Sequence, residues 1–237
     1  MKISIITLFP EMFDGPFKYS IVQRAIEKKL VQISFINLRD FGLGKHKLVD
    51  DTPYGGGYGM ILRADVLLKA VQSAKIRDTK TKQKVVLLSP HGKSFKQKIA
   101  KRFSKLDNLI LICGHYEGFD ERIKNYIDEE ISVGDFILTG GELPAMLVTD
   151  SVVRLIKGAI AKGSPEEESF SPLLEYPQYT KPAVFKGLHV PDILLSGNHK
   201  EIAKWRMEKS LQITRKLRPD LIKTASNSSE KKNWPLN

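Results

Sequence analysis

Five short apolar runs, separated by segments of helical periodicity, constrain the fold of this chain most strongly. The runs lie at residues 2–9, 31–38, 85–88, 109–113 and 136–138. Helical spacing of apolar side chains is found at residues 20–30, 63–74 and 95–103, and again after residue 142. Strands that alternate with helices in this way are typical of an α/β protein. We therefore predict a mostly parallel sheet with helices packed on its faces.

The stretch 131–146, ISVGDFILTGGELPAM, holds the most unusual connection of this pattern. We expect residues 136–138 to form the fifth strand, Gly140 and Gly141 to turn the chain, and a helix to begin at Glu142. Glycine has no Cβ and accepts positive φ, so such a turn lets the backbone crowd a ligand. Taken alone, the stretch is explained more simply as a tight connection that binds nothing.

The ends of the three last strands change that interpretation. Glycine or proline loops follow them at residues 89–92, 114–118 and 139–141. In open α/β sheets, ligands bind beyond the carboxyl ends of the strands. Three such loops at one edge of the sheet therefore predict a pocket. The polar, glycine-rich segment 39–60 is a long loop, and loops of that length are often functional.

The charge balance favours a polyanionic partner. The chain has 38 Lys and Arg residues against 27 Asp and Glu residues, a net charge of +11. Nucleic acid is the first candidate, an anionic membrane surface the second, and a solvated basic surface the simplest alternative. No apolar run is long enough for a transmembrane helix, and the start of the chain does not fit a signal peptide. We expect a soluble, cytoplasmic protein with no membrane partner.

Several common site chemistries do not match the sequence. Cys113 is the single cysteine, which excludes an intrachain disulfide and a CxxC metal site. Gly92, Lys93 and Ser94 resemble the end of a P-loop, but the leading glycine of that motif falls on Leu87. No strand-to-helix junction shows GxGxxG, and the five histidines lack zinc-ligand spacing.

The amino-acid composition of the chain changes after residue 160. We predict a first domain at 1–160, a flexible linker at 161–174 and a basic helical domain with a polar tail at 175–237. The linker contains Glu166, Glu167 and Glu168, and a basic helix is expected at about 200–217.

Seven blocks, in order, resemble the bacterial tRNA (guanine-N1)-methyltransferase family of the SPOUT superfamily. They are LFPEMF at 8–13, VDDTPYGGGYGM at 49–60, LSPHG at 88–92, CGHYEGFDER at 113–122, SVGDFILTGGELPAM at 132–146, EYPQYTKP at 175–182 and LLSGNHKEIAKWR at 194–206. The resemblance implies a deep trefoil knot, a homodimer and S-adenosylmethionine as methyl donor. It also implies a substrate, N1 of the guanosine immediately 3′ of the anticodon in tRNA, and a product, 1-methylguanosine.

The same resemblance assigns site residues by position. The cofactor contacts it implies are Leu88, Ser89, Pro90, His91, Gly114, Tyr116, Glu117, Val133, Gly134, Asp135, Phe136, Ile137, Leu138, Gly140, Gly141 and Pro144. The family's general base is an aspartate before Ser-Phe, where this chain has Glu168, and the family's catalytic arginine falls on Arg154. Other departures are Tyr58 for a proline, His115 for an arginine and Phe119 for an aliphatic residue. Magnesium assists the family's reaction; its site here is unassigned, with Glu117 and the linker acids as candidates.

The basic C-terminal part is expected to bind tRNA phosphates. The candidate side chains are Lys200, Lys204, Arg206, Lys209 and Arg215. Two alternatives stay open from the sequence: a non-catalytic RNA-binding factor with the same fold, and a SPOUT methyltransferase that acts on ribosomal RNA or on a ribose hydroxyl.

Overall fold

The computed structural model describes residues 1–160 and 168–226 and divides the chain into two compact units, Met1–Ala161 and Lys162–Asn237. The first unit is built from the following helices and strands. They are β1 (Lys2–Thr7), η1 (Pro10–Phe13), α1 (Ser20–Glu27), β2 (Gln32–Asn37), η2 (Leu38–Phe41), β3 (Asp50–Asp51), β4 (Ile61–Leu62), α2 (Ala64–Ala74), β5 (Gln83–Ser94), α3 (Gln97–Phe103), β6 (Asn108–Ile112), η3 (Glu121–Tyr126), β7 (Glu129–Ser132) and α4 (Glu142–Val153).

A five-stranded sheet organises the first unit. Its order is β2-β1-β6-β5-β7, and every pair of neighbouring strands is parallel. The predicted α/β class with a parallel sheet is therefore confirmed. All five strands point their carboxyl ends to one edge, where β5, β6 and β7 lie side by side.

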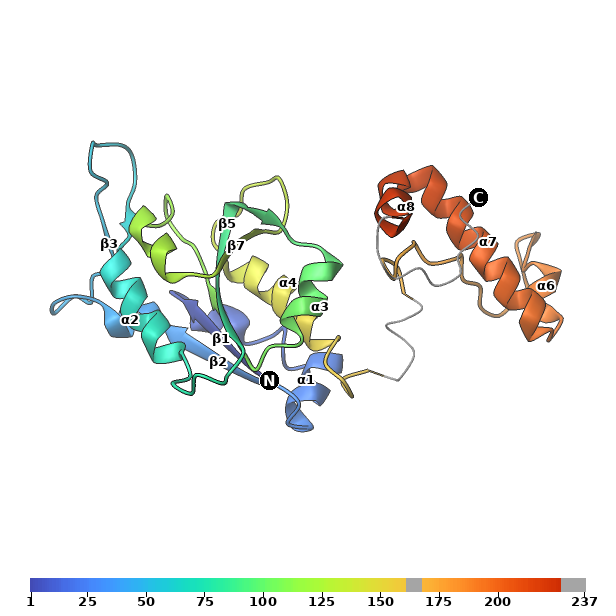
Figure 1. Ribbon diagram of the computed structural model, residues 1–237, viewed down its shortest axis with the longest axis horizontal. Helices are drawn as coiled ribbons and strands as arrows, with labels where there is room; N and C mark the ends of the chain where they lie inside the picture. The colour runs from blue at the N-terminus through green and yellow to red at the C-terminus, as the bar shows by residue number, and fades with distance from the viewer. Residues whose placement is uncertain (161–167, 227–237) are drawn as a thin grey trace. The chain divides into compact units, whose positions relative to one another are not determined.

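Both faces of this sheet are buried, and alternate residues of each strand serve different faces. Leu109 and Leu111 of β6 pack in one apolar core with α1, α3 and α4, whereas Ile110 and Ile112 pack in a second core with α2, η2 and η3. Figure 1 shows α2 on one side of the sheet and α1, α3 and α4 on the other. A strand covered on both faces needs apolar residues in succession, which is the pattern of the runs in the sequence.

The structure corrects the predicted fifth strand. Residues 136–138 are not in a strand; the last strand of the sheet is β7, and residues 133–141 form a loop between β7 and α4. The apolar side chains of this loop are largely exposed, Ile137 by 82%. They belong to the exposed surface of the loop and not to the core. Hydrophobicity alone does not distinguish an exposed apolar loop from a buried strand. Strand β5 also extends beyond Leu88 to Ser94, with an irregularity in its pairing to β7.

The second unit is described by itself. Its elements are β8 (Val184–Phe185), β9 (Leu188–His189), α6 (Asp192–Leu195), α7 (His199–Leu217) and α8 (Pro219–Ser226). The buried Thr214 of α7 accepts a hydrogen bond from the Leu174 N–H at 2.9 Å, which holds the preceding segment against the helix. The predicted basic helix is therefore present. Among the described residues, no helix is long and apolar enough to cross a membrane.

The buried centre of the sheet provides the first prediction. Replacing Leu111, fully buried in β6, by alanine removes apolar contacts and leaves a cavity, so the free energy of unfolding should fall by about 2–5 kcal/mol. Urea unfolding followed by circular dichroism measures the change. Leu48→Ala, at a half-exposed side chain, should change it by less than about 0.5 kcal/mol. Equal losses in the two variants would contradict the described core.

Candidate functional site

A pocket of about 400 Å³ lies at the carboxyl ends of β5, β6 and β7. Its walls come from residues 88–91 of β5, from η3 and the end of β7, from the loops that follow β6 and β7, and from the start of α4. Of the cofactor contacts predicted from the sequence, all but Asp135 line this one pocket. The three predicted segments do meet at one edge of the sheet, but residues 89–92 are part of the irregular end of β5 and not a loop. The role of each residue stays a prediction.

Direct contact between two backbones closes the floor of the pocket. The Gly141 N–H donates to the Gly114 carbonyl oxygen at 2.7 Å. A Cβ on Gly141 would lie 2.5 Å from the Gly114 nitrogen and 2.6 Å from the Cys113 Cα. Real Cβ atoms do not approach backbone that closely, so only glycine allows this packing. The φ of Gly141 is −83°, so the requirement is steric and not conformational.

A buried carboxylate directly after the glycine turn connects the turn to the end of β1. Glu142, the first residue of α4, accepts a hydrogen bond at 2.7 Å from the hydroxyl of Thr7, which ends β1. The same Thr7 oxygen accepts from the Phe9 N–H at 2.9 Å. A carboxylate at a helix N-terminus is also favoured by the helix dipole. Burial, and then the nearby Glu142 charge, raises the pKa of the Cys113 thiol, so this cysteine is neutral and structural.

Several residues that line the pocket were not among the predicted contacts. They are His115, Gly118, Phe119, Glu121, Lys124, Glu130, Ile131, Ser132 and Thr139. Lys124 is the cation of this set, and its Nζ lies 3.0 Å from Glu121 Oε1 and 3.4 Å from Glu130 Oε2. The hydrogen bond that Lys124 donates to Glu121, together with the charge of Glu130, raises the pKa of Lys124. Glu121 and Lys124 line the pocket because η3 lies beside it, and Glu130 because it belongs to β7.

His115 occupies a special position in the wall. Its ring packs edge-on against Phe9 at 5.1 Å and Tyr116 at 4.9 Å between centroids. Its Nδ1 is buried and has no hydrogen-bond partner within residues 1–160 and 168–226. A Cβ on Gly140 would lie 2.9 Å from this nitrogen and 2.3 Å from Glu142 Oε2. Gly140, the first glycine of the turn, is therefore also enclosed by side chains.

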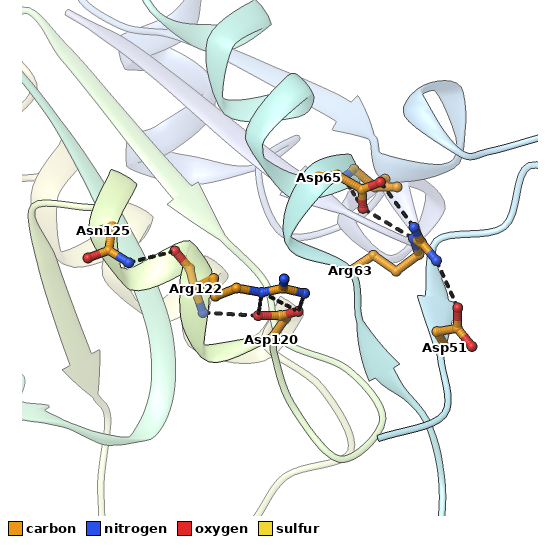
Figure 2. A network of polar contacts seen from close by, with 7 residues as sticks. Asp51, Arg63, Asp65, Asp120, Arg122 and Asn125 are labelled. Carbon is orange, nitrogen blue, oxygen red and sulfur yellow. Dashed lines mark hydrogen bonds and ion pairs between the residues drawn. The ribbon is translucent and has the colours of Figure 1, made fainter. Parts of the chain in front are cut away.

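An ion-pair network lies beside the pocket at the base of loop 52–60 (Figure 2). Arg63 bridges Asp51 of β3, at 2.8 Å, and both oxygens of Asp65 in α2, at 3.1 Å each. Asp120 accepts from the Arg122 side chain and caps η3 by accepting from the Arg122 N–H at 3.0 Å. These bonds lower the pKa values of Asp65 and Asp120.

The structure places the two predicted catalytic residues in different units. Arg154 follows α4 directly, as its C-cap, and does not line the pocket. Glu168 is half-buried in the second unit. Glu166 and Glu167 lie outside the described residues. The division of the chain after Ala161 lies close to the predicted end of the first domain, while the predicted linker and tail boundaries stay predictions.

The cations predicted to bind tRNA all belong to α7. Lys200, Lys204 and Arg215 are exposed. The Arg206 guanidinium lies over the Tyr176 ring at 4.8 Å, and Lys209 Nζ donates to Gln212 at 3.2 Å. The helix thus presents a basic surface, and binding of RNA to it stays a prediction.

The pocket suits the cofactor that the resemblance implies better than it suits a metal ion. It has a volume common for small-molecule sites, apolar walls at Leu88, Val133 and Leu138, and backbone groups exposed by glycines. An adenine ring and a methionine chain need this combination. In contrast, no group of three His, Cys, Asp or Glu side chains able to hold a metal ion occurs among the residues described.

The fold and the pocket together define an α/β protein with a glycine-lined pocket at one edge of a parallel sheet. A family model described as tRNA (Guanine-1)-methyltransferase TrmD matches residues 1–224. The chain therefore belongs to the tRNA (guanine-1)-methyltransferase family. This finding confirms the family resemblance and the prediction of an enzyme.

The chain is similar to individual members of this family over almost their whole length. The chain is 53% identical over 234 residues to a tRNA (guanine-N(1)-)-methyltransferase of Dictyoglomus turgidum, which covers 97% of this chain and 93% of that protein. It is 52% identical over 236 residues to one of Caldanaerobacter subterraneus subsp. tengcongensis, with 99% and 97% covered. It is 54% identical over 234 residues to one of Clostridium botulinum (strain Eklund 17B / Type B), with 98% and 97% covered.

The glycine floor gives a second prediction. Gly141→Ala forces apart the loops after β6 and β7, so binding of S-adenosylmethionine should weaken by roughly tenfold or more, measured by isothermal titration calorimetry. The matched control is Gly15→Ala, where a Cβ meets nothing within 4 Å. The control should bind as the wild type does. Unchanged binding by Gly141→Ala would contradict the close contact described here.

The network in Figure 2 gives a third prediction, on pH dependence. Asp120→Asn should lower the free energy of unfolding at pH 7 by no more than about 1 kcal/mol, because the ion pair is partly exposed. The folded-state pKa of Asp120 is lowered, so its contribution is complete above the unfolded-state value of about 3.9 and disappears as the pH falls through the folded-state value. Urea unfolding at pH 7 and at successively lower pH tests this. A difference between variant and wild type that persists unchanged in acid would contradict it.

Proposed function

We propose that this chain transfers the methyl group of S-adenosylmethionine to N1 of the guanosine immediately 3′ of the anticodon in tRNA, which gives 1-methylguanosine. The observation that carries the proposal is the convergence of all but one of the predicted cofactor contacts on a single pocket in a chain of this family. The proposal includes the deep trefoil knot of the SPOUT fold, supported by the loop between β7 and α4 that packs on the backbone after β6.

The pocket residues bind and orient the methyl donor in this proposal. Bound there, S-adenosylmethionine supplies an electrophilic methyl group on its sulfonium. Leu88, Val133 and Leu138 provide apolar walls for the adenine ring, and the glycine loops provide amide and carbonyl partners for its edge. Phe136 packs against Gly134, where a Cβ would lie 2.3 Å from its ring, and so closes one side of the pocket.

Glu168 is proposed to be the general base. N1 of guanine carries a proton at neutral pH, and this proton has to leave as the methyl group arrives. The turn that follows Glu168 is held by two hydrogen bonds, from Phe170 N–H to the Leu173 oxygen at 2.7 Å and from Glu175 N–H to Ser169 Oγ at 3.0 Å. The carboxylate therefore stands at the start of an ordered turn. Glutamate keeps the carboxylate of the family's aspartate and extends its reach by one methylene.

Arg154 is proposed to stabilise the negative charge that develops on guanine O6. It cannot do so in the pocket of its own chain. The twelve residues of α4 separate it from the glycine turn by about 18 Å, farther than an arginine side chain reaches. We therefore assign Arg154 to the pocket of a second copy, which makes the predicted homodimer a requirement of catalysis. Half-exposed Leu143 and Leu147, one turn apart on α4, support an interface at this helix.

The basic face of α7 is proposed to hold tRNA through its phosphates. Lys200, Lys204 and Arg215 are exposed there, and such contacts give salt-dependent affinity without reading the sequence. An unpaired guanosine in the anticodon loop leaves its stack at low cost, which allows N1 to reach the pocket.

The proposed base yields the fourth prediction. With labelled S-adenosylmethionine and unmodified tRNA, the wild type should form 1-methylguanosine, identified after nucleoside digestion. Glu168→Gln should lower kcat by roughly 10²- to 10⁴-fold while cofactor binding is kept, because only the proton acceptor is lost. Glu168→Asp should retain turnover, and Glu201→Gln, at an exposed glutamate of α7, is the matched control with wild-type turnover.

Three results would contradict parts of this proposal. Full activity of Glu168→Gln would remove Glu168 as the base and leave the reaction in place. A methylated ribose or a product in ribosomal RNA would show that the acceptor is wrong. Absence of any 1-methylguanosine with a competent tRNA would refute the proposed function.

A further inference from the structure

Loop 52–60 exposes two tyrosine rings almost completely to solvent. Tyr54 is 99% and Tyr58 is 97% exposed. The glycines at 55, 56, 57 and 59 all have positive φ, between +77° and +132°. Large apolar surfaces are normally buried, so two fully exposed rings on a glycine-rich loop indicate a surface that acquires a partner.

The base of this loop is fixed although its tip is built of glycine. Strands β3 and β4 pair on either side of it, and Arg63 joins Asp51 to Asp65 below them (Figure 2). Three backbone hydrogen bonds connect its end to the pocket wall, between Glu117 and Met60 at 3.0 Å, Leu62 and Gly118 at 2.9 Å, and Asp120 and Leu62 at 2.9 Å. The base of the loop is therefore fixed relative to the pocket wall.

Tyr58 stands next to the rim of the pocket. A Cβ on Gly59 would lie 2.5 Å from Glu117 Cγ, so the backbone at Gly59 rests on a side chain that lines the pocket. Tyr58 is the residue before Gly59, and its Cα lies about 3.8 Å from that of Gly59. Tyr54 belongs to the same loop, four residues earlier. The loop therefore carries both exposed rings beside the wall of the pocket.

We propose that Tyr58, with Tyr54, stacks on an unstacked purine of the tRNA anticodon loop at the mouth of the cofactor pocket. This inference rests on the proposed function and names a further contact of the same substrate. Aromatic side chains bind unpaired bases by stacking, which needs exposed ring faces and tolerates a flexible support. Tyr58 stands where the family resemblance expects proline, so the contact is a feature of this chain and not of the motif.

Binding of tRNA and stacking of the base are measured separately from turnover. Fluorescence anisotropy with an unmodified anticodon stem-loop gives the dissociation constant of wild type and variants. Tyr58→Ala should weaken binding roughly 5- to 150-fold, and Tyr58→Phe, which keeps the ring, should stay within about threefold of wild type. Tyr54→Ala should weaken binding in the same direction. Tyr19→Ala, at an exposed tyrosine before α1, should not.

A 2-aminopurine probe locates the stacked base. It is placed either at the target position or at the last anticodon position of the stem-loop, and its fluorescence should be quenched by the wild type and not by Tyr58→Ala at one of these two positions. Wild-type affinity and wild-type quenching in Tyr58→Ala overturn the inference, whether or not the enzyme methylates guanosine. A loss of affinity that follows dissociation of a dimer in sedimentation also overturns it, because the ring then contacts a second copy. A wild type that binds and quenches through Tyr58 but forms no 1-methylguanosine supports the stacking and refutes the proposed function.

Discussion

Contact between the backbone of Gly141 and that of Cys113 and Gly114 is the constraint on which the site depends. It joins the loop after β7 to the loop after β6 and leaves no room for a side chain between them. The buried Glu142–Thr7 hydrogen bond then ties the same turn to the end of β1. Because these supports belong to a sheet that is buried on both faces, the pocket is preorganised before any ligand arrives, which limits the cost of ordering on binding.

The position of Arg154 at the far end of α4 is the basis of the proposed dimeric active site. Helix α4 starts at the pocket and ends at this arginine, and this separation is the reason why Arg154 is proposed to act in the pocket of a second chain. The proposed use of a second chain explains why a helix with a well-packed inner face also carries half-exposed leucines. The proposed base in the second unit adds a further part that has to come together on tRNA. Assembly of the site from separate parts allows the enzyme to test the substrate before the methyl group moves.

The parallel sheet could be predicted because strands buried on both faces leave uninterrupted apolar runs, as in residues 109–113. The same reasoning misplaced the fifth strand, since Phe136 and Ile137 are as apolar as a strand but stand in a loop. It missed β7 because Glu129 and Glu130 look unsuited to a sheet, although Lys84 and Lys124 pair with them in three dimensions. The pocket was predicted from the glycines and prolines at strand ends, and its individual contacts were predicted from the family resemblance. No pattern in the sequence indicated Lys124, because η3 reaches the pocket only through tertiary packing.

Hydrogen exchange of the whole protein tests most directly whether the end of β5 and the loops after β6 and β7 hold the methyl donor. The exchange is followed by mass spectrometry with and without saturating S-adenosylhomocysteine, the demethylated cofactor. Slowed exchange is expected in peptides that cover residues 88–92, 114–118 and 133–141, and unchanged exchange in α7. Protection confined to the second unit, or none at saturating ligand, would contradict this assignment.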